Sequence, residues 1–522
     1  MAGGAELQAD VLIVGAGPSG LMLAVVLARL GVDAIIVDGK SGPTRESRAL
    51  AVQARTMELY DQLGLVDRVL AERSPATAVV PGFGSHPFGR VELRGIGEGV
   101  SPYLEVTVFE QSRNERMLVD ALAGLGREVR WGHRLARLDV VAEDDAGDGE
   151  RAGERAGAAS VIAGLDGPDG PVTVRARYCV GADGAHSPVR EALGVPFEGV
   201  TNEHSFYVTD AAGVTGLVEG AINIRITAEH FLLGFPMGAG RMRLLGVVRD
   251  RDLDAAGELA EDTVKDLVRR EFGVAYTDSA WFSRYRLHHR LAKRFRVGPC
   301  FLVGDAAHIH SPVGAQGMNT GLQEAHNLAC AFADVLVRGM PDARLDRYEA
   351  ERRPVGRVLV DTTDRMFGVV TAGGRLARFV RGRVVPVIGP VAVRLLPRMI
   401  GGRRVFGYLS QTRIHYRMSP RTSSGRDRVV GRRLPWLGGD VDNFAPLRAF
   451  TWQVHGYGVY EPEVRAIAET LGLEWHAFPP DPQGRLDPGL VYLVRPDGFV
   501  AAAASARAVP GGPPAFREQL AG

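Results

Sequence analysis

The stretch that most constrains the fold is VLIVGAGPSGLMLAVVLARLGVDAIIVD, residues 11–38. The apolar run of residues 11–14 predicts a buried strand, and Pro18 suits the first turn of a helix, where an N–H has no helical partner. Gly31 ends that helix, and residues 33–38 predict the next strand. A strand, a glycine turn, a helix and a second strand in close succession predict an α/β fold that begins with a Rossmann-like unit.

The glycines of this stretch have the spacing GxGxxG, which is typical of a dinucleotide site. They permit a tight turn, close approach of a pyrophosphate and close packing of helix on strand, while the helix start offers free N–H groups to phosphates. Asp38 ends the second strand, where a carboxylate accepts hydrogen bonds from ribose hydroxyls and disfavours NADP. The motif alone does not separate NAD from FAD. The predicted dinucleotide contacts are Gly15, Gly17, Pro18, Ser19, Gly20 and Asp38.

A second glycine turn lies in VGDAAHIHSPVGAQGMNTGLQEAHNLA, residues 303–329. Gly304 lets the chain turn at a strand end, and Asp305 is placed to accept hydrogen bonds from a polyol, although a helix cap is the alternative. Next comes a helix start that stabilises negative charge, as reduced flavin carries and nicotinamide does not. The pattern therefore favours FAD over NAD. The predicted contacts with the flavin ring are Pro312, Gly314, Gly317, Met318 and Asn319.

Two histidines in this stretch invite other interpretations. His308 and His310 stand at i and i+2 without a third ligand nearby, so no metal site is expected. A loop histidine is more often hydrogen-bonded structure than a catalytic base, and we assign no side-chain base.

Composition narrows the partners and the compartment. The 522 residues hold 62 Lys and Arg against 61 Asp and Glu, which gives no electrostatic case for nucleic acid. We expect no membrane span, because no long uncharged apolar run occurs. The chain start shows no signal-peptide pattern, and the three cysteines are far apart without a CxxC motif. These features predict a cytoplasmic protein with buried thiols.

Several separated motifs resemble the FAD-dependent aromatic hydroxylases, the group that includes para-hydroxybenzoate, phenol and polyketide hydroxylases. The resemblance extends over about residues 8–360. Its motifs are GAGPSG at 15–20, SRALAVQARTMELYDQLG at 47–64, EQSRNERML at 110–118, CVGADGAHSPVR at 179–190 and the stretch from 304 quoted above.

The resemblance implies roles for matching positions only. Asp183, with Gly184, resembles the turn that touches FAD and the nicotinamide cofactor, and Arg48 resembles an arginine near the pyrophosphates. Gln111 resembles a glutamine that contacts FAD, and Pro312 a proline whose carbonyl faces the substrate beside the flavin. Arg48 as a surface charge and Gln111 as a partner of nearby backbone are the alternatives.

The implied reaction is a monooxygenation. NADPH or NADH reduces non-covalently bound FAD, O2 adds at flavin C4a, and the hydroperoxide hydroxylates an electron-rich aromatic, such as a phenol or a polyketide-like natural product or antibiotic. No second GxGxxG unit appears, so NAD(P)H is expected to bind near Arg48 and Asp183 without a Rossmann domain of its own. Phe231, Phe235 and Met237 are candidate substrate walls, with ordinary sheet core as the alternative.

The same resemblance implies a domain plan. A discontinuous Rossmann-like FAD-binding domain would take residues 1–75, 100–184 and 286–365, and a mainly β substrate domain 76–99 and 185–285. Connecting helices would follow over 366–424. Within them, residues 369–405 are apolar but interrupted by arginines, which favours a solvated basic face, with a membrane-surface role as the alternative. Residues 425–522 resemble a thioredoxin-like α/β domain without cysteine, which implies a structural or dimerisation role in a monomer or homodimer.

Three other functions remain open on this scaffold. A Baeyer–Villiger oxygenase or an epoxidase would use the same cofactors. A non-catalytic flavoprotein that binds aromatic compounds is the alternative from another class, and the intact GADG turn and two FAD motifs argue against it.

Overall fold

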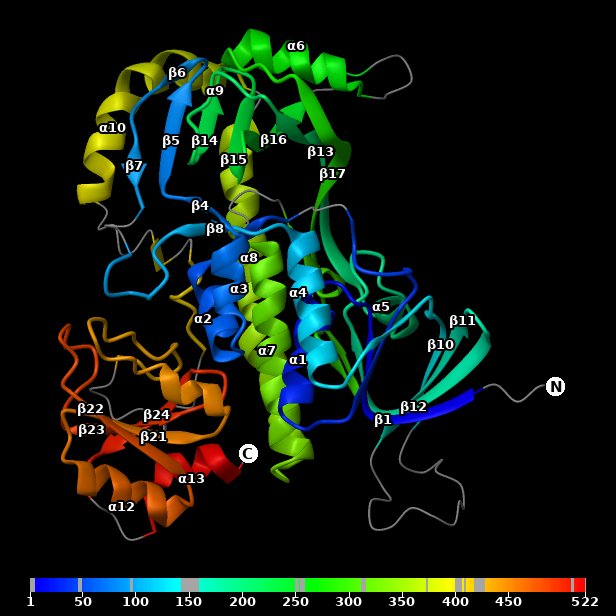
Figure 1. Cartoon of the computed structure of the whole chain (residues 1–522), viewed down its shortest axis with the longest axis vertical. Coiled ribbons are helices and arrows are strands. Elements are labelled where there is room, and N and C mark those ends of the chain that lie inside the picture. The colour runs from blue at the N-terminus through cyan, green and yellow to red at the C-terminus, as the bar shows by residue number, and fades with distance from the viewer. Residues whose placement is uncertain are drawn as a thin grey trace.

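The computed structural model describes residues 5–45, 49–93, 97–141, 159–248, 253, 259–310, 316–371, 374–399, 406–407, 410–416, 428–507 and 511–521. Figure 1 shows three parts: a central α/β body, a β-rich part above it, and a smaller C-terminal α/β part beside the lower half. The first quoted stretch, residues 11–38, falls in the central body.

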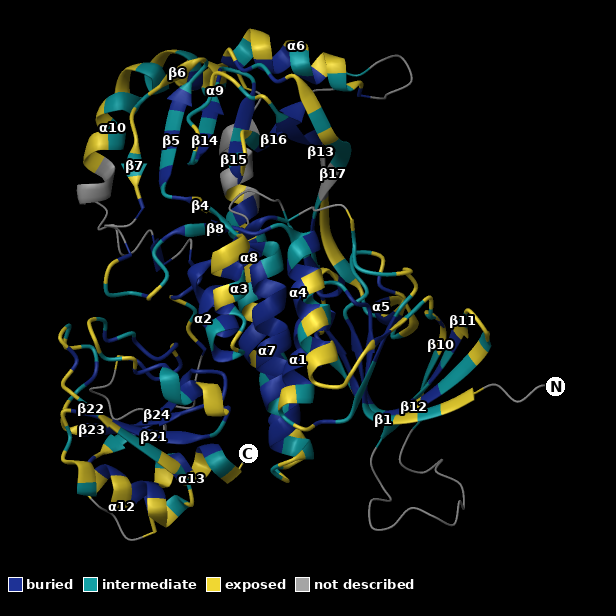
Figure 2. Cartoon of the chain, in the orientation of Figure 1, coloured by how far each residue is buried: buried dark blue, intermediate teal, exposed yellow. Residues whose placement is uncertain are grey.

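An eight-stranded sheet forms the central body, with the strand order β10-β11-β12-β1-β2-β9; in addition, β19 pairs with β12, and β18 pairs with β19. Strand β1 runs parallel to both β2 and β12, as the Rossmann-like pattern predicts. Figure 2 shows the buried residues of this body concentrated on the sheet and on α1 and α7. The strands are β1 (Ala5–Val14), β2 (Ala34–Asp38), β9 (Val129–Trp131), β10 (Arg134–Val141), β11 (Ser160–Gly167), β12 (Gly170–Gly181), β18 (Arg296–Val297) and β19 (Cys300–Leu302).

Helices α1 (Pro18–Arg29), α4 (Gln111–Gly124) and α7 (Gly317–Leu336) contribute to the core of this body. The apolar spacing from Met318 to Leu336 predicts one face of a helix, and this is the face of α7 that packs there. The apolar periodicity of residues 55–71 also predicts a single amphipathic helix, and this expectation was wrong. These residues form α2 (Ala54–Gln62) and α3 (Val66–Glu72), because Gly64 adopts the left-handed conformation at φ 74°.

A nine-stranded sheet forms the upper part, in the order β20-β17-β13-β16-β15-β14-β5-β6, with β7 paired to β5. Helix α6 (Glu261–Phe272) covers one of its faces through Val264, Leu267 and Phe272. The strands are β5 (Ala78–Phe83), β6 (His86–Pro87), β7 (Val91–Glu92), β13 (Phe197–Ala212), β14 (Ala221–Ile226), β15 (Phe231–Gly238), β16 (Arg241–Val248), β17 (Asp278–Ala292) and β20 (His308–Ile309). A small sheet of β3 (Ala51–Val52), β8 (Val106–Val108) and β4 (Ser74–Ala76) lies between the two parts.

Helix α8 (Asp346–Thr371) leads upward from the central body to α9 (Arg375–Phe379), a π-helical segment (Val380–Val384) and α10 (Val385–Met399). Of the helices in the described ranges, none is long and apolar enough to cross a membrane.

The C-terminal part has a four-stranded sheet in the order β22-β21-β23-β24, the thioredoxin-like order. The sequence of this part predicts a helix near residues 464–473 and two strands joined by a Pro496-Asp497-Gly498 turn. Both are found: β21 (Gln453–Tyr457) and β22 (Glu474–Phe478) are parallel and joined by α12 (Glu461–Leu471). Strands β23 (Leu490–Val494) and β24 (Val500–Ser505) are antiparallel and joined by that turn. Helix α13 (Pro514–Ala521) follows.

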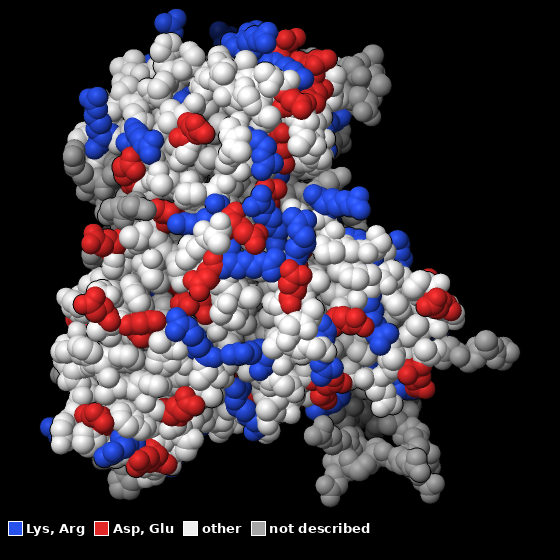
Figure 3. Space-filling model, in the orientation of Figure 1, with Lys and Arg blue, Asp and Glu red and all other residues white. Residues whose placement is uncertain are grey.

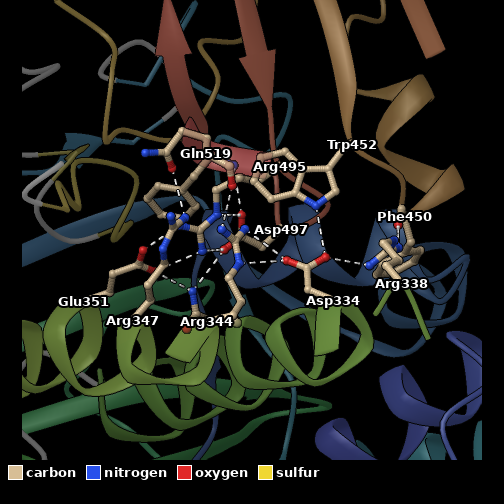
Figure 4. Close-up of polar contacts among 12 residues, drawn as sticks. Asp334, Arg338, Arg344, Arg347, Glu351, Phe450, Trp452, Arg495, Asp497 and Gln519 are labelled. Carbon is tan, nitrogen blue, oxygen red and sulfur yellow. Dashed lines mark hydrogen bonds and ion pairs between the residues drawn. The ribbon is translucent and has the colours of Figure 1, made fainter. Parts of the chain in front are cut away.

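Buried charges join this part to α7 and α8, as Figure 4 shows. The Asp334 carboxylate accepts hydrogen bonds from Trp452 Nε1 at 3.0 Å and from Arg344 Nε at 3.0 Å. Asn327 donates to both Glu351 and Asp497 at 3.0 Å, so α7, α8 and the Asp497 turn share one network. The C-terminal part is thereby fixed against the two helices.

Candidate functional site

Three glycine turns that are far apart in the sequence meet at one end of the central sheet. A Cβ built on Gly15 would overlap the carbonyl of Ala182, which precedes the Asp183 turn. A Cβ on Gly304 would lie 2.6 Å from Ser19 Oγ, and one on Gly321 would overlap the same hydroxyl. The first turn of α1 therefore packs directly against the 304 turn and the start of α7, which requires glycine at these positions.

The first glycine turn leaves room for a ligand at one position only. A Cβ on Gly20 would overlap the Gly15 carbonyl, whereas a Cβ on Gly17 would have no protein atom within 4 Å. No side chain caps the first turn of α1, and that turn holds no acidic residue. Open space beside Gly17 and uncapped N–H groups at a helix start fit a pyrophosphate.

Asp38 stands beside this turn at the end of β2. Its Oδ2 accepts a hydrogen bond from Ala16 N at 2.7 Å, and its Oδ1 accepts one from Lys40 N at 2.8 Å. Lys40 Nζ lies 3.7 Å from Oδ2. These bonds orient the carboxylate beside the glycine turn, where a ribose would follow the pyrophosphate.

Asp183 presents an unsatisfied acceptor next to Gly15. Its Oδ2 accepts from Val189 N at 3.0 Å, while its Oδ1 is buried and makes no hydrogen bond to any described residue. Burial raises the pKa of this carboxyl above its ordinary value. A buried acceptor without a donor fits a site that a ligand completes.

The 304 turn forms a short 3₁₀ helix, Gly304–Ala306, in which Asp305 is exposed between two buried neighbours. Helix α7 begins nearby, again without a side-chain cap or an acidic first turn. The Asn319 side chain is buried and accepts hydrogen bonds from Gln53 N and Thr56 Oγ1, both at 2.8 Å. The amide side chain of this residue is therefore engaged within the protein, and Met318 is half-buried beside it.

A family profile for an FAD binding domain matches residues 8–363. The 6-methylpretetramide 4-monooxygenase of Streptomyces rimosus is 36% identical over 441 residues, which cover 81% of this chain and 72% of that protein. The chain belongs to the FAD-dependent aromatic hydroxylases.

Two further comparisons agree that the chain belongs to this family. Rifampicin monooxygenase of Streptomyces venezuelae is 34% identical over 365 residues, covering 68% of this chain and 70% of that protein. The solved structure of OxyS anhydrotetracycline hydroxylase from Streptomyces rimosus superposes with a TM-score of 0.74 at 27% identity and covers 96% of each chain. The enzyme is an FAD-dependent monooxygenase that uses O2, and NAD(P)H is the electron donor typical of the family.

Three predicted site residues of the hydroxylase, Arg48, Pro312 and Gly314, lie outside the described residues. The chain on either side of them is described. Gln111 Oε1 accepts a hydrogen bond from Ala49 N at 3.2 Å, which is the backbone contact named as its alternative role. Its contact with FAD stays a prediction.

Two buried glutamates support the site of the hydroxylase and were missed in the sequence. Glu115 accepts hydrogen bonds from Thr44 N at 2.7 Å and from Gln111 Nε2 at 3.0 Å. Glu324 on α7 accepts from Gly304 N at 2.9 Å and lies 2.9 Å from His308 Nε2. Glu324 stood out only as a charged residue within the helix predicted after residue 317. No helix was predicted around Glu115, so nothing in the sequence pattern indicated its role.

The candidate substrate walls of the hydroxylase lie on β15. Phe231 and Met237 are buried, while Phe235 is half-buried. Phe231, Leu233 and Phe235 share the face turned away from α6, because side chains alternate along a strand.

A charged pair on the same sheet was also missed. Arg243 is 1% exposed and makes a bidentate pair with Asp210 at 2.6 and 2.7 Å. The guanidinium also lies 5.4 Å from the ring of Trp281. Nothing in the local sequence pattern of these two strands indicated the pair.

Proposed function

We propose that this monooxygenase hydroxylates a large, electron-rich polycyclic phenol of the polyketide or antibiotic type. The observation that carries the proposal is the sheet face opposite α6, where Ile224, Leu233, Phe235 and Tyr285 are only half-buried. Apolar side chains that keep part of their surface free, several strands wide, suit a broad flat apolar ligand. The relatives named above act on tetracycline precursors and rifampicin, which supports the same class.

The sheet that carries this face is connected along the chain to the segment proposed to contact the flavin. Strand β20 pairs with β17 through Leu291 and His308 and through Arg290 and Ile309. The chain then runs through residues 310–316 into α7. A substrate lying against the nine-stranded sheet would therefore share that sheet with β20, the strand from which the chain leads to α7.

The proposed cofactor contacts follow from the site geometry. The pyrophosphate would lie on the open side of Gly17, the adenosine ribose would be bound by Asp38, and the ribityl chain by Asp305. The N–H groups at the start of α7 would stabilise negative charge on the flavin. When bound, FAD supplies hydride acceptance and oxygen activation, while the chain orients the substrate and excludes water.

The nicotinamide donor, NADPH or NADH, is proposed to bind near Arg48 and the Asp183 turn. No second dinucleotide motif occurs in the sequence, so the donor has no Rossmann domain of its own. The buried Asp183 Oδ1 supplies one free acceptor there.

The proposed domain plan takes the boundaries given above, with the C-terminal part as a structural or dimerisation unit. That unit has no cysteine, since the last one in the chain is Cys330. We also propose a reducing, cytoplasmic location for a monomer or homodimer, supported by three free, buried thiols.

The test measures NADPH and NADH oxidation together with oxygen uptake, with and without polycyclic phenols and simple phenols. Both rates should rise most with a polycyclic phenol, and one atom of labelled O2 should appear as a ring hydroxyl by mass spectrometry and NMR. A lactone or epoxide product would show a different oxygen transfer. Reducible FAD without any aromatic-stimulated oxidation would favour the binding flavoprotein.

Two variants test whether the sheet face opposite α6 contacts the substrate. Leu233→Trp should raise the KM for the polycyclic phenol about tenfold or more while leaving FAD content unchanged, since it fills the free face. Leu232→Met is the matched control, because Leu232 is buried on the α6 side of the same strand. Equal KM values for both variants and the wild type would remove this face from the substrate site.

A further inference from the structure

The segment that crosses the edge of the nine-stranded sheet has an extreme charge pattern. Residues 365–426 contain no Asp, Glu or Lys. The basic residues in that segment are Arg365, Arg375, Arg378, Arg381, Arg383, Arg394, Arg398, Arg403, Arg404, Arg413, Arg417, Arg421 and Arg426. In a chain with nearly equal numbers of acidic and basic residues, this concentrates positive charge in one place.

The same segment exposes large apolar side chains. Seven of the fourteen exposed large apolar side chains in the described part of the chain lie between residues 376 and 395. We call them the apolar stripe: Leu376 75%, Phe379 58%, Val380 40%, Val387 73%, Ile388 55%, Val391 56% and Leu395 45% exposed. Leu376 lies three and four residues before Phe379 and Val380 on the first helical stretch, and Val387 and Ile388 are followed by Val391 and Leu395 at similar spacing on α10. Within each stretch this spacing places the members on one side of the helix. Figure 2 shows exposed residues along α10.

The opposite side of the segment is packed against the sheet. The apolar stripe is therefore exposed on a helix that is firmly attached. A Cβ built on Gly389 would overlap the ring of Phe88, and one on Gly89 would lie 3.4 Å from Val393. Arg381 Nη2 donates to the carbonyl of Ala228 at 3.0 Å. Helix α10 is thus anchored on strands β5 and β7, and Figure 1 shows it at that edge of the sheet. The members of the stripe remain exposed.

Arginines flank the apolar stripe and are available to a partner. Arg375, Arg383 and Arg394 are exposed, and none forms an ion pair with an acidic side chain in the described ranges. Arg378 Nη1 lies 3.4 Å from Glu229. Because this ion pair is exposed, it contributes little to stability. Figure 3 shows basic side chains over α10 at the rim of the molecule.

We propose that the apolar stripe and its arginines dock the hydroxylase on an anionic lipid surface. Apolar side chains on one side of a helix, with arginines beside them, enter the headgroup region while the arginines bind phosphates. A helix with an exposed apolar stripe fits a lipid surface, which adapts to it, better than a rigid protein groove. A second copy docked stripe to stripe would place arginines against arginines without a compensating carboxylate in this segment, so the charge argues against it.

The experiment uses the full-length enzyme loaded with FAD. Flotation with vesicles of phosphatidylcholine containing phosphatidylglycerol, compared with phosphatidylcholine alone, measures binding at low and at high salt. Wild-type enzyme should bind the anionic vesicles, and added salt should weaken binding because the headgroup attraction is screened. Arg383→Gln/Arg394→Gln should lower the vesicle affinity on the order of tenfold.

Val387→Ser/Val391→Ser should also lower vesicle affinity about tenfold, because it removes apolar contact. Val358→Ser is the matched control, since Val358 is 58% exposed on α8, and it should bind as the wild type does. Absence of binding to either vesicle, or equal binding by all variants, would overturn the proposal. So would light scattering that shows a wild-type dimer and a monomeric Val387→Ser/Val391→Ser variant, because a second copy would then cover the stripe.

Discussion

Arg495, at the end of β23, forms a buried ion pair with Glu351 on α8, with Nη1 2.5 Å from Oε1. Its Nη2 also lies 2.6 Å from Oδ2 of Asp497. Each of these three side chains is less than 9% exposed. The contact between the C-terminal part and the central body therefore depends on buried charges that pair with one another (Figure 4).

Arg495→Met should destabilise the enzyme by about 3–5 kcal/mol, because it leaves two buried carboxylates without their cation. The measurement is urea unfolding followed by tryptophan fluorescence. Arg448→Met is the control at the same contact, since Arg448 is about half-exposed and pairs with Asp61 at 2.8 Å. Arg448→Met should lower the free energy of unfolding by less than about 1 kcal/mol. Equal losses in the two variants would contradict a buried, coupled network.

Two glycines of the first turn should respond differently to the same substitution. Gly17→Ala should fold normally yet bind FAD about tenfold or more weakly, because its methyl enters only the space proposed for the pyrophosphate. Gly20→Ala should lower the melting temperature of the apoprotein, because its methyl overlaps the Gly15 carbonyl. FAD titration and thermal unfolding of the apoproteins measure both effects. A Gly17→Ala variant with wild-type FAD affinity would place the pyrophosphate elsewhere.

The pair of His308 and Glu324 should make stability depend on pH. Burial lowers the pKa of His308, but the adjacent Glu324 carboxylate outweighs burial and raises it above the ordinary value of 6.5. Burial opposes ionisation of Glu324, but His308 and Arg352 hold its pKa below 4.5. The histidine therefore stabilises the fold fully below pH 6.5, and that contribution is lost as pH rises through its raised folded pKa. The ionised Glu324 stabilises the fold fully above pH 4.5, and this stabilisation is lost as the pH falls through its lowered folded pKa.

Glu324→Gln should accordingly cost more stability at pH 6 than at pH 9, measured by urea unfolding at each pH. The substitution keeps an acceptor for Gly304 N, so the pH-dependent part reports the charge pair. A difference between variant and wild type that is the same at both pH values would show that His308 is neutral in the folded enzyme.

The three cysteines should be inert in the native enzyme. A hydrogen bond to Cys300 and burial raise the pKa of Cys179 well above its ordinary value, and burial does the same for Cys330. Titration with a thiol reagent should find none reactive in the folded enzyme and three after unfolding in denaturant. Rapid reaction of one native thiol would show that one of these sites opens.

The sequence alone determined the features that depend on near neighbours in the chain. The GxGxxG spacing and the apolar runs around it predicted β1, α1 and β2, because backbone conformation at a glycine turn follows from local sterics. The Pro496-Asp497-Gly498 turn and the apolar face of α7 were predicted for the same reason. The single helix expected over residues 55–71 failed because Gly64 adopts a left-handed conformation that apolar periodicity does not reveal.

Only the tertiary structure decided which distant residues meet. Ser19 lies against Gly304 and Gly321, and Glu324 joins the 304 turn to His308. The partner of a buried charge is chosen by packing across strands and helices, as with Asp210 and Arg243 or Glu351 and Arg495, and no periodicity along the chain encodes it. The exposure of the apolar side of α10 was likewise decided by the tertiary structure. The sequence pattern of an arginine-rich apolar helix is the same whether its apolar residues are covered or exposed. Burial is a property of the assembled fold, and the sequence determines it only through the whole set of contacts.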